Sequence, residues 1–142
     1  MSPHVSRLIC AGCLALWLLA GCDRLRRASQ CERLADAVNG AMRSISNDTA
    51  SITPASLHAG ARHYEALSQA LGPMQFSDRQ MAIEVESFRR SLDSAAYLCQ
   101  ELAEDLDKNE LAQAALHKRD LDALKGPMKS QAYRMNVWCR EH

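Results

Sequence analysis

The chain has 142 residues, with 17 Lys or Arg balanced by 17 Asp or Glu, so its formal net charge is zero. This length suits one domain, and the mixed charges lack the basic face that binding a nucleic acid requires, so we expect no nucleic-acid partner. Alanine, leucine, glutamate and arginine are abundant and β-branched residues few, a composition typical of helices.

Residues 1–21 have the pattern of a secretory signal peptide. They contain Arg7 but no acidic side chain, and an apolar run extends from Leu8 to Ala20. This run is shorter than the about 20 apolar residues that a stable membrane-spanning helix needs. A charged start, a short apolar middle and small residues at the end therefore predict an exported protein.

The segment Leu19-Ala20-Gly21-Cys22 resembles the lipobox of bacterial lipoproteins. The resemblance implies cleavage before Cys22 and attachment of lipid, including palmitate, to its thiol, so that the chain is anchored to a membrane of the cell envelope. Several acyl chains together make such an anchor effectively permanent. Asp23 next to the lipidated cysteine slightly favours the inner membrane and a periplasmic location, with the exterior as the other possibility. The alternatives to the lipobox are an uncleaved membrane helix and an ordinary secretory signal.

We therefore expect a signal peptide at residues 1–21, a lipid-anchored tether at 22–28 and one helical domain at 29–142. The first helix is predicted over residues 29–46 because apolar side chains recur there at steps of three and four. The polar stretch 47–53 then connects it to the next helix.

The second helix is predicted to begin at Thr53, an N-cap residue, with Pro54 at its first helical position. Gly72 and Pro73 should end it, since glycine can adopt the left-handed cap and proline cannot continue a helix.

The third helix is predicted from Ser77 and Gln80, which have capping-box spacing. Its apolar side chains alternate four- and three-residue steps, the spacing of packed helices in a bundle. They are Met81, Val85, Phe88, Leu92, Ala95, Cys99, Leu102 and Leu106.

The chain should reverse near Lys108 and Asn109 and form a last helical segment that Gly126 and Pro127 interrupt. Because the apolar phase continues across the interruption, we favour one kinked helix over residues 109–141. Two helices with a turn near Lys125 are the alternative. The expected fold is all-α, an up-down bundle of two short and two long helices.

The cysteines beyond the lipobox are Cys31, Cys99 and Cys139, and cysteines of exported proteins tend to pair. An up-down bundle brings the start of its first helix to the end of its fourth, which predicts a Cys31–Cys139 disulfide. If the last segment is two helices, Cys99–Cys139 becomes the better pair. Otherwise Cys99 is a possible free thiol that packs as a small apolar side chain.

A second resemblance concerns the start of the folded part, Cys31-Glu32-Arg33-Leu34-Ala35 with Val38-Asn39, together with the closing Cys139. These residues are similar to uncharacterised small helical lipoproteins with terminal cysteine pairs. The resemblance favours the end-to-end disulfide and implies no particular activity.

Residues that would carry catalysis or bind a metal are scarce. No nucleophile elbow, glycine-rich phosphate loop or HExxH motif occurs. His58 and His63 would lie about 140° apart around a helix, a poor arrangement for joint metal binding. We therefore expect no enzyme activity, no catalytic residue, no metal and no cofactor.

The resulting hypothesis is a lipid-anchored, non-enzymatic module that binds another envelope protein or has a structural role. Tyr133 and Trp138 either anchor that partner or cover the end of the core. The alternative is a periplasmic sensor or carrier that holds a small apolar ligand or a metal between its helices.

Overall fold

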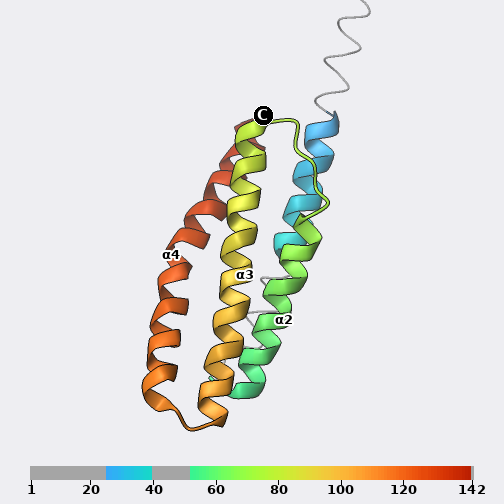
Figure 1. Cartoon of the computed structure of the whole chain (residues 1–142). Helices are drawn as coiled ribbons and strands as arrows, with labels where there is room; N and C mark the ends of the chain where they lie inside the picture. The colour runs from blue at the N-terminus through green and yellow to red at the C-terminus, as the bar shows by residue number, and fades with distance from the viewer. Residues whose placement is uncertain (1–24, 40–51, 142) are drawn as a thin grey trace, which may run out of the picture.

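The computed structural model describes residues 25–39 and 52–141, and within these ranges the chain is helical without any strand. A first helix covers residues 25–39 and is followed by α2 (Pro54–Leu71), α3 (Arg79–Asp107) and α4 (Leu111–Glu141). Figure 1 shows that each of these helices runs opposite to the one before it. The all-α up-down bundle with two short and two long helices is thus confirmed.

The first helix begins earlier than the sequence pattern predicted. Residues 25–28, which we had expected in an extended tether, are already helical. Leu25, Arg26, Arg27 and Ala28 all have high helix propensity and no Gly or Pro interrupts them, so nothing opposes extension of the helix in this direction. The end of this helix, predicted at residue 46, lies outside the described residues.

The start of α2 matches its prediction, and its end differs in one respect. The Thr53 side chain accepts a hydrogen bond from the Ser56 backbone N–H, and the Ser56 hydroxyl accepts one from the Thr53 N–H, forming a capping box. Gly72 ends the helix with φ −52° and ψ −49°, so the expected left-handed cap was wrong. Because Gly72 keeps a helical backbone, the end of α2 is attributable to Pro73, whose nitrogen carries no hydrogen.

The N-cap of α3 is Asp78 rather than the predicted Ser77. Asp78 Oδ1 accepts a hydrogen bond of 2.7 Å from the Met81 backbone N–H, and aspartate caps a helix as well as serine does. The apolar residues predicted to face the core from this helix are confirmed. All of them are buried except Leu106, which is partly buried. At about 1.5 Å per residue, the 29 residues of α3 span roughly 44 Å.

The last segment is one helix, as favoured from the sequence, and Pro127 lies inside it. Asn109, with φ 59°, provides the left-handed residue of the short turn that joins α3 to α4. Figure 1 shows that α4 bends along its course instead of following α3 as a straight rod. Leu111, the first residue of α4, has the spacing of its apolar residues and is nevertheless 64% exposed.

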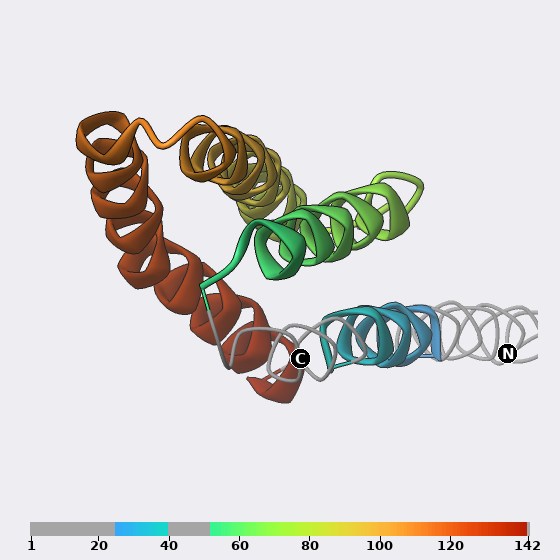
Figure 2. The same ribbon diagram turned by 90° about the horizontal axis from the view of Figure 1, so that it is seen from below.

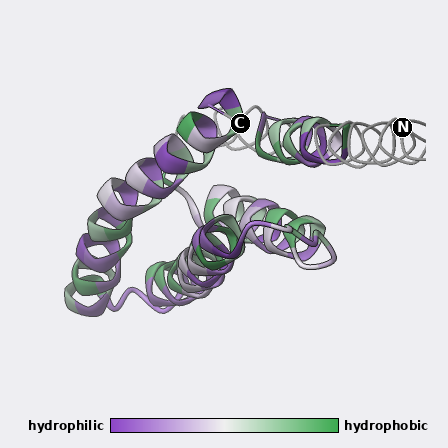
Figure 3. Cartoon of the chain, turned by 90° about the horizontal axis from the view of Figure 1, so that it is seen from above, coloured by the Kyte–Doolittle hydropathy of each residue, from purple (hydrophilic) through white to green (hydrophobic). Residues whose placement is uncertain are grey.

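The helices are arranged around α3, which packs against both α2 and α4. Seen along the bundle, the first helix lies beside the C-terminal end of α4 (Figure 2). Hydrophobic and hydrophilic residues are interspersed along the helices (Figure 3), and in α3 the buried residues recur at steps of three and four, which makes that helix amphipathic.

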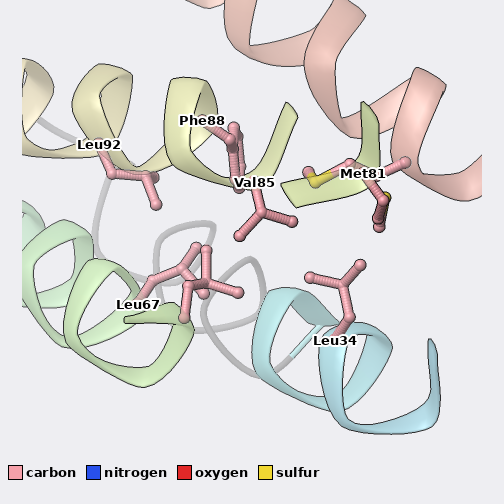
Figure 4. Packing of buried hydrophobic residues seen from close by; sticks show 8 residues of the cluster. Leu34, Leu67, Met81, Val85, Phe88 and Leu92 are labelled. Atoms are coloured by element: carbon pink, nitrogen blue, oxygen red, sulfur yellow. The ribbon is translucent and has the colours of Figure 1, made fainter. Parts of the chain in front are cut away.

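Buried side chains form two clusters. The disulfide-end cluster draws on all four helices, and Figure 4 shows six of its members converging from the first helix, α2 and α3. It comprises Leu34, Leu67, Leu71, Met81, Val85, Phe88, Leu92 and Met135. The turn-end cluster lies toward the α3–α4 turn, and its described members come from α2, α3 and α4. They are Leu57, Ala61, Ala96, Cys99, Leu102, Ala103 and Ala114.

Candidate interaction site

The predicted disulfide joins the first helix to the end of α4. The sulfur atoms of Cys31 and Cys139 are 2.07 Å apart, and their Cα atoms are separated by 5.7 Å. One turn further along each helix, Leu34 and Met135 enter the same disulfide-end cluster. The covalent link and the apolar contact together fix where the C-terminal turn of α4 lies.

On the other side of this turn, α3 and α4 enclose a hollow of about 240 Å³. We call it the Tyr133 hollow. Its lining combines aromatic, aliphatic and charged side chains from the start of α3 and the end of α4. These are Gln80, Met81, Glu84, Tyr133, Arg134, Val137, Trp138 and Glu141.

A bidentate ion pair holds the floor of the hollow in place. Arg134 donates from Nε to Glu84 Oε1 at 3.0 Å and from Nη2 to Glu84 Oε2 at 2.9 Å. Arg134 also donates from Nη1 to the Ser130 hydroxyl at 2.9 Å, which uses the third side of its guanidinium group. The Glu84 carboxylate raises the pKa of Arg134 above its usual value. This exposed pair adds little stability by itself, but its geometry fixes the relative rotation of α3 and α4.

The two aromatic residues of the hollow differ in exposure. Trp138 packs against the disulfide-end cluster and is partly buried, so it covers the end of the core. Tyr133 is 67% exposed, although large aromatic side chains are usually buried at least in part. Exposed tyrosine beside arginine and a partly buried tryptophan is the combination that dominates binding energy in protein interfaces. Trp138 therefore has the role of covering the end of the core. The exposure of Tyr133 fits the other role, that of anchoring a partner.

Of the other cysteines, Cys22 lies outside the described residues and Cys99 is a free, buried thiol on α3. Burial raises the pKa of the Cys99 thiol to about 11 from 9.0, which makes it a poor nucleophile. Burial of the Tyr64 side chain, together with the nearby Cys99, raises the pKa of Tyr64 above its usual value. Cys99 therefore occupies the buried seam position that its spacing predicted.

A largely buried histidine–aspartate hydrogen bond near the α3–α4 turn had not been predicted. His117 Nδ1 lies 2.7 Å from Asp105 Oδ2, and the Asp105 carboxylate is almost wholly buried. It joins the last turn of α3 to α4, so we interpret it as a structural link across the turn. The one sequence signal is that Asp105 lies between the seam residues Leu102 and Leu106, next to a position that faces the core.

The remaining candidate ligands do not converge. No three His, Cys, Asp or Glu side chains within residues 25–39 and 52–141 are grouped so as to hold a metal ion. Met81 and Met135 are buried and Met128 is packed against the disulfide-end cluster, so these methionines fill the core. In the same ranges, no helix has the length and apolar character needed to cross a membrane.

Comparisons with known protein families, with curated proteins and with solved structures found no match to this chain.

Proposed function

We propose that this protein is a lipoprotein of the bacterial cell envelope, a non-enzymatic interaction module that binds another envelope protein through the Tyr133 hollow. The observation that carries the binding role is the 67% exposure of Tyr133 beside Arg134 and Trp138. Lipid on Cys22, inferred from the lipobox resemblance, would hold the module at the membrane, with the inner membrane slightly favoured by Asp23.

The position of the hollow supports this combination. The first helix is described from residue 25, and Figure 1 places its start at the same end of the bundle as the C-terminus and the start of α3. The Tyr133 hollow is formed at that end. A lipid on Cys22, three residues before Leu25, would therefore present the hollow close to the membrane surface, within reach of a membrane-embedded partner.

The shape of the hollow indicates what it accepts. Its volume of about 240 Å³ suits one aromatic or branched aliphatic side chain, not a whole peptide. Because Arg134 and Glu84 already pair with each other, these two charges are neutralised before a partner arrives. We therefore expect a partner that inserts an apolar anchor side chain, with polar contacts around it.

The lipid anchor is tested by Cys22→Ala in the host bacterium grown with labelled palmitate. The variant should carry no label and should accumulate as a longer precursor, because the thiol that accepts the lipid is absent. Label that persists on the Cys22→Ala protein would contradict the anchor.

The binding role is tested by placing a photo-crosslinking amino acid at position 133 in the intact envelope. We expect one adduct of defined mass at this position and also at Val137, which lies one turn further along α4 in the lining of the same hollow. The matched control is Tyr97, a tyrosine of α3 that is 57% exposed and lies outside the hollow.

The specificity of the adduct is tested by Glu84→Gln, which removes one partner of the ion pair on the floor of the hollow. Because Arg134 would then lose its fixed orientation, yield at position 133 should fall several-fold while the protein level stays constant. Equal adducts at positions 97 and 133, or none at 133 and 137, would refute this surface as the binding site.

A further inference from the structure

A second hollow lies beside the turn-end cluster, where α2 and α4 flank α3. Both helices pack against α3, and the space left between them is a hollow of about 190 Å³. We call it the Cys99 hollow. Its lining comprises Ile52, Ser56, Leu57, Gly60, Tyr64, Ala95, Cys99, Leu102, Lys118, Leu121, Asp122, Lys125 and Met128.

The wall of this hollow is mostly apolar, and its uncharged polar groups are the Cys99 thiol and the hydroxyl groups of Ser56 and Tyr64. Leu57, Leu102 and Leu121 supply aliphatic surface, and the thiol of Cys99 lies among them. Cys99 is only 4% exposed and is bonded to no other cysteine. Most of the surface that a ligand would meet here is aliphatic, as in other small-molecule sites. This surface suits an apolar ligand.

Gly60 enlarges the hollow at a cost to the helix. It lies in the interior of α2, where glycine is about 1 kcal/mol less favourable than alanine. A Cβ atom at this position would meet only Cys99 Sγ, at an ordinary contact distance of 4.0 Å. Close packing of the helices therefore does not require glycine here. Its effect is to keep space open above Cys99.

Three charged side chains of α4 lie at the rim of the hollow, two of them positive and one negative. Lys118 Nζ and Lys125 Nζ each lie 2.6 Å from a different oxygen of Asp122. These two lysines lower the pKa of Asp122 to about 2, so the carboxylate is ionised at neutral pH and the rim carries one net positive charge. The lysine side chains are 48% and 72% exposed, which leaves each ammonium group free to donate to a further acceptor.

We propose that the Cys99 hollow binds a small linear carboxylate, with its alkyl chain between α2 and α4 and its carboxylate on Lys118 and Lys125. Because an engineered apolar cavity of about 150 Å³ holds benzene, a hollow of about 190 Å³ holds a chain of roughly six to ten carbons. The amphiphilic shape matches an apolar wall with a cationic rim. This site is separate from the Tyr133 hollow, so either proposal can fail alone.

The test uses the full chain in membranes of its host, with sodium octanoate as the ligand and Cys99 as the reporter. The rate at which a small thiol reagent modifies Cys99 is followed by the mass of the peptide that contains it. At a concentration ten times its dissociation constant, octanoate should slow this modification about tenfold. 1-Octanol, with the same chain and no charge, should protect less at equal concentration.

Two pairs of substitutions separate the charge on the rim from general effects of charge. Lys118→Gln with Lys125→Gln should reduce the protection by octanoate to the level given by 1-octanol. Lys108→Gln with Lys129→Gln, which removes two exposed lysines outside the hollow, should leave the protection unchanged. All four lysines are at the surface, so the fold should tolerate both pairs.

Gly60→Leu tests the apolar part of the proposal, because the new side chain would occupy the hollow. In this variant octanoate should no longer change the rate of Cys99 modification. Octanoate that leaves the rate unaltered in the unmodified chain would overturn the site. Equal protection in the Lys118→Gln, Lys125→Gln variant would overturn the role of the rim.

Discussion

The two ends of the bundle share α2, α3 and α4 but differ in the contribution of the first helix and in the size of their buried side chains. The disulfide-end cluster receives Leu34 from the first helix and Met135 from α4, so it is covered from four directions. The turn-end cluster has seven members among the described residues, and five of them are alanine or cysteine. Among the described residues, the disulfide end therefore packs larger side chains, from one more helix, than the turn end does.

This contrast teaches that a regular apolar pattern does not guarantee uniform packing. α3 keeps the same four- and three-residue spacing through both clusters. Its neighbours set the outcome, because large side chains face it at one end and small ones at the other. Stability and ligand binding are therefore expected to separate along the length of α3.

The largest expected effect comes from removing the disulfide with Cys31→Ser and Cys139→Ser. The bridge closes a loop with a sequence separation of 108, and in the chain-entropy model such a link contributes about 4.7 kcal/mol. We expect the free energy of unfolding to fall by about 4 kcal/mol in chemical denaturation.

Hydrogen exchange would localise that loss. Amides of the first helix and of the last turns of α4 should lose most protection, and amides of α3 near Cys99 should lose least. A uniform loss of protection along α3 would contradict the separation of the two ends.

Truncation of a leucine at each end gives the second comparison. Leu92→Ala, in the disulfide-end cluster, should lower the free energy of unfolding by about 3 to 4 kcal/mol, since Leu92 is only 1% exposed. Leu102→Ala, on the same helix but beside the Cys99 hollow, should cost about 2 kcal/mol because it loses fewer contacts. Equal values for the two variants would show that the hollow is filled in solution.

The third prediction concerns alkaline pH. The pKa of Cys99 is about 11 in the folded chain against about 9.0 for a solvated thiol. Below pH 9 the thiol is neutral in both states. Between pH 9 and 11 the unfolded chain releases this proton while the folded chain keeps it, so stability falls as pH rises. The loss should reach at most about 2 to 3 kcal/mol.

Cys99→Ala is the control for this pH dependence. Other groups titrate in the same range, so the quantity to compare is the change in the free energy of unfolding from pH 8.5 to 10.5 in each protein. The variant should lose less stability than the unmodified chain. Parallel pH profiles would mean that the thiol is solvated in the native state.

The smallest effect is expected at Gly126, in the interior of α4. A Cβ atom built there meets nothing within 4 Å, so alanine fits without a clash. Gly126→Ala should raise the free energy of unfolding by up to about 1 kcal/mol through helix propensity. A decrease, measured by thermal unfolding, would show that the bend of α4 depends on this glycine.

The periodic features of the sequence were sufficient to predict the bundle. Each of the apolar positions assigned to α3 is buried or partly buried, and Thr53 with Pro54 marked the start of α2 correctly. The continuous apolar phase across Pro127 favoured one helix, and that choice brought Cys139 to Cys31. These predictions succeeded because they depend on repeated spacing and on topology.

Predictions that depended on one residue were less successful. Ser77 and Asp78 are adjacent and both are good N-caps, so the sequence could not select between them. Leu111 fits the apolar phase of α4 and is nevertheless exposed. The Asp105–His117 pair and both hollows arise from the relative placement of α3 and α4, which no local pattern encodes.

The disulfide also determines how the domain would carry a mechanical load. Tension applied between a point before Cys31 and a point after Cys139 passes from one sulfur to the other and bypasses the helices between them. Among the described residues, only those before Cys31 in the first helix and those after Cys139 in α4 lie outside this covalent ring. Under pulling, the bundle would therefore stay folded while the segments before Cys31 and after Cys139 stretched.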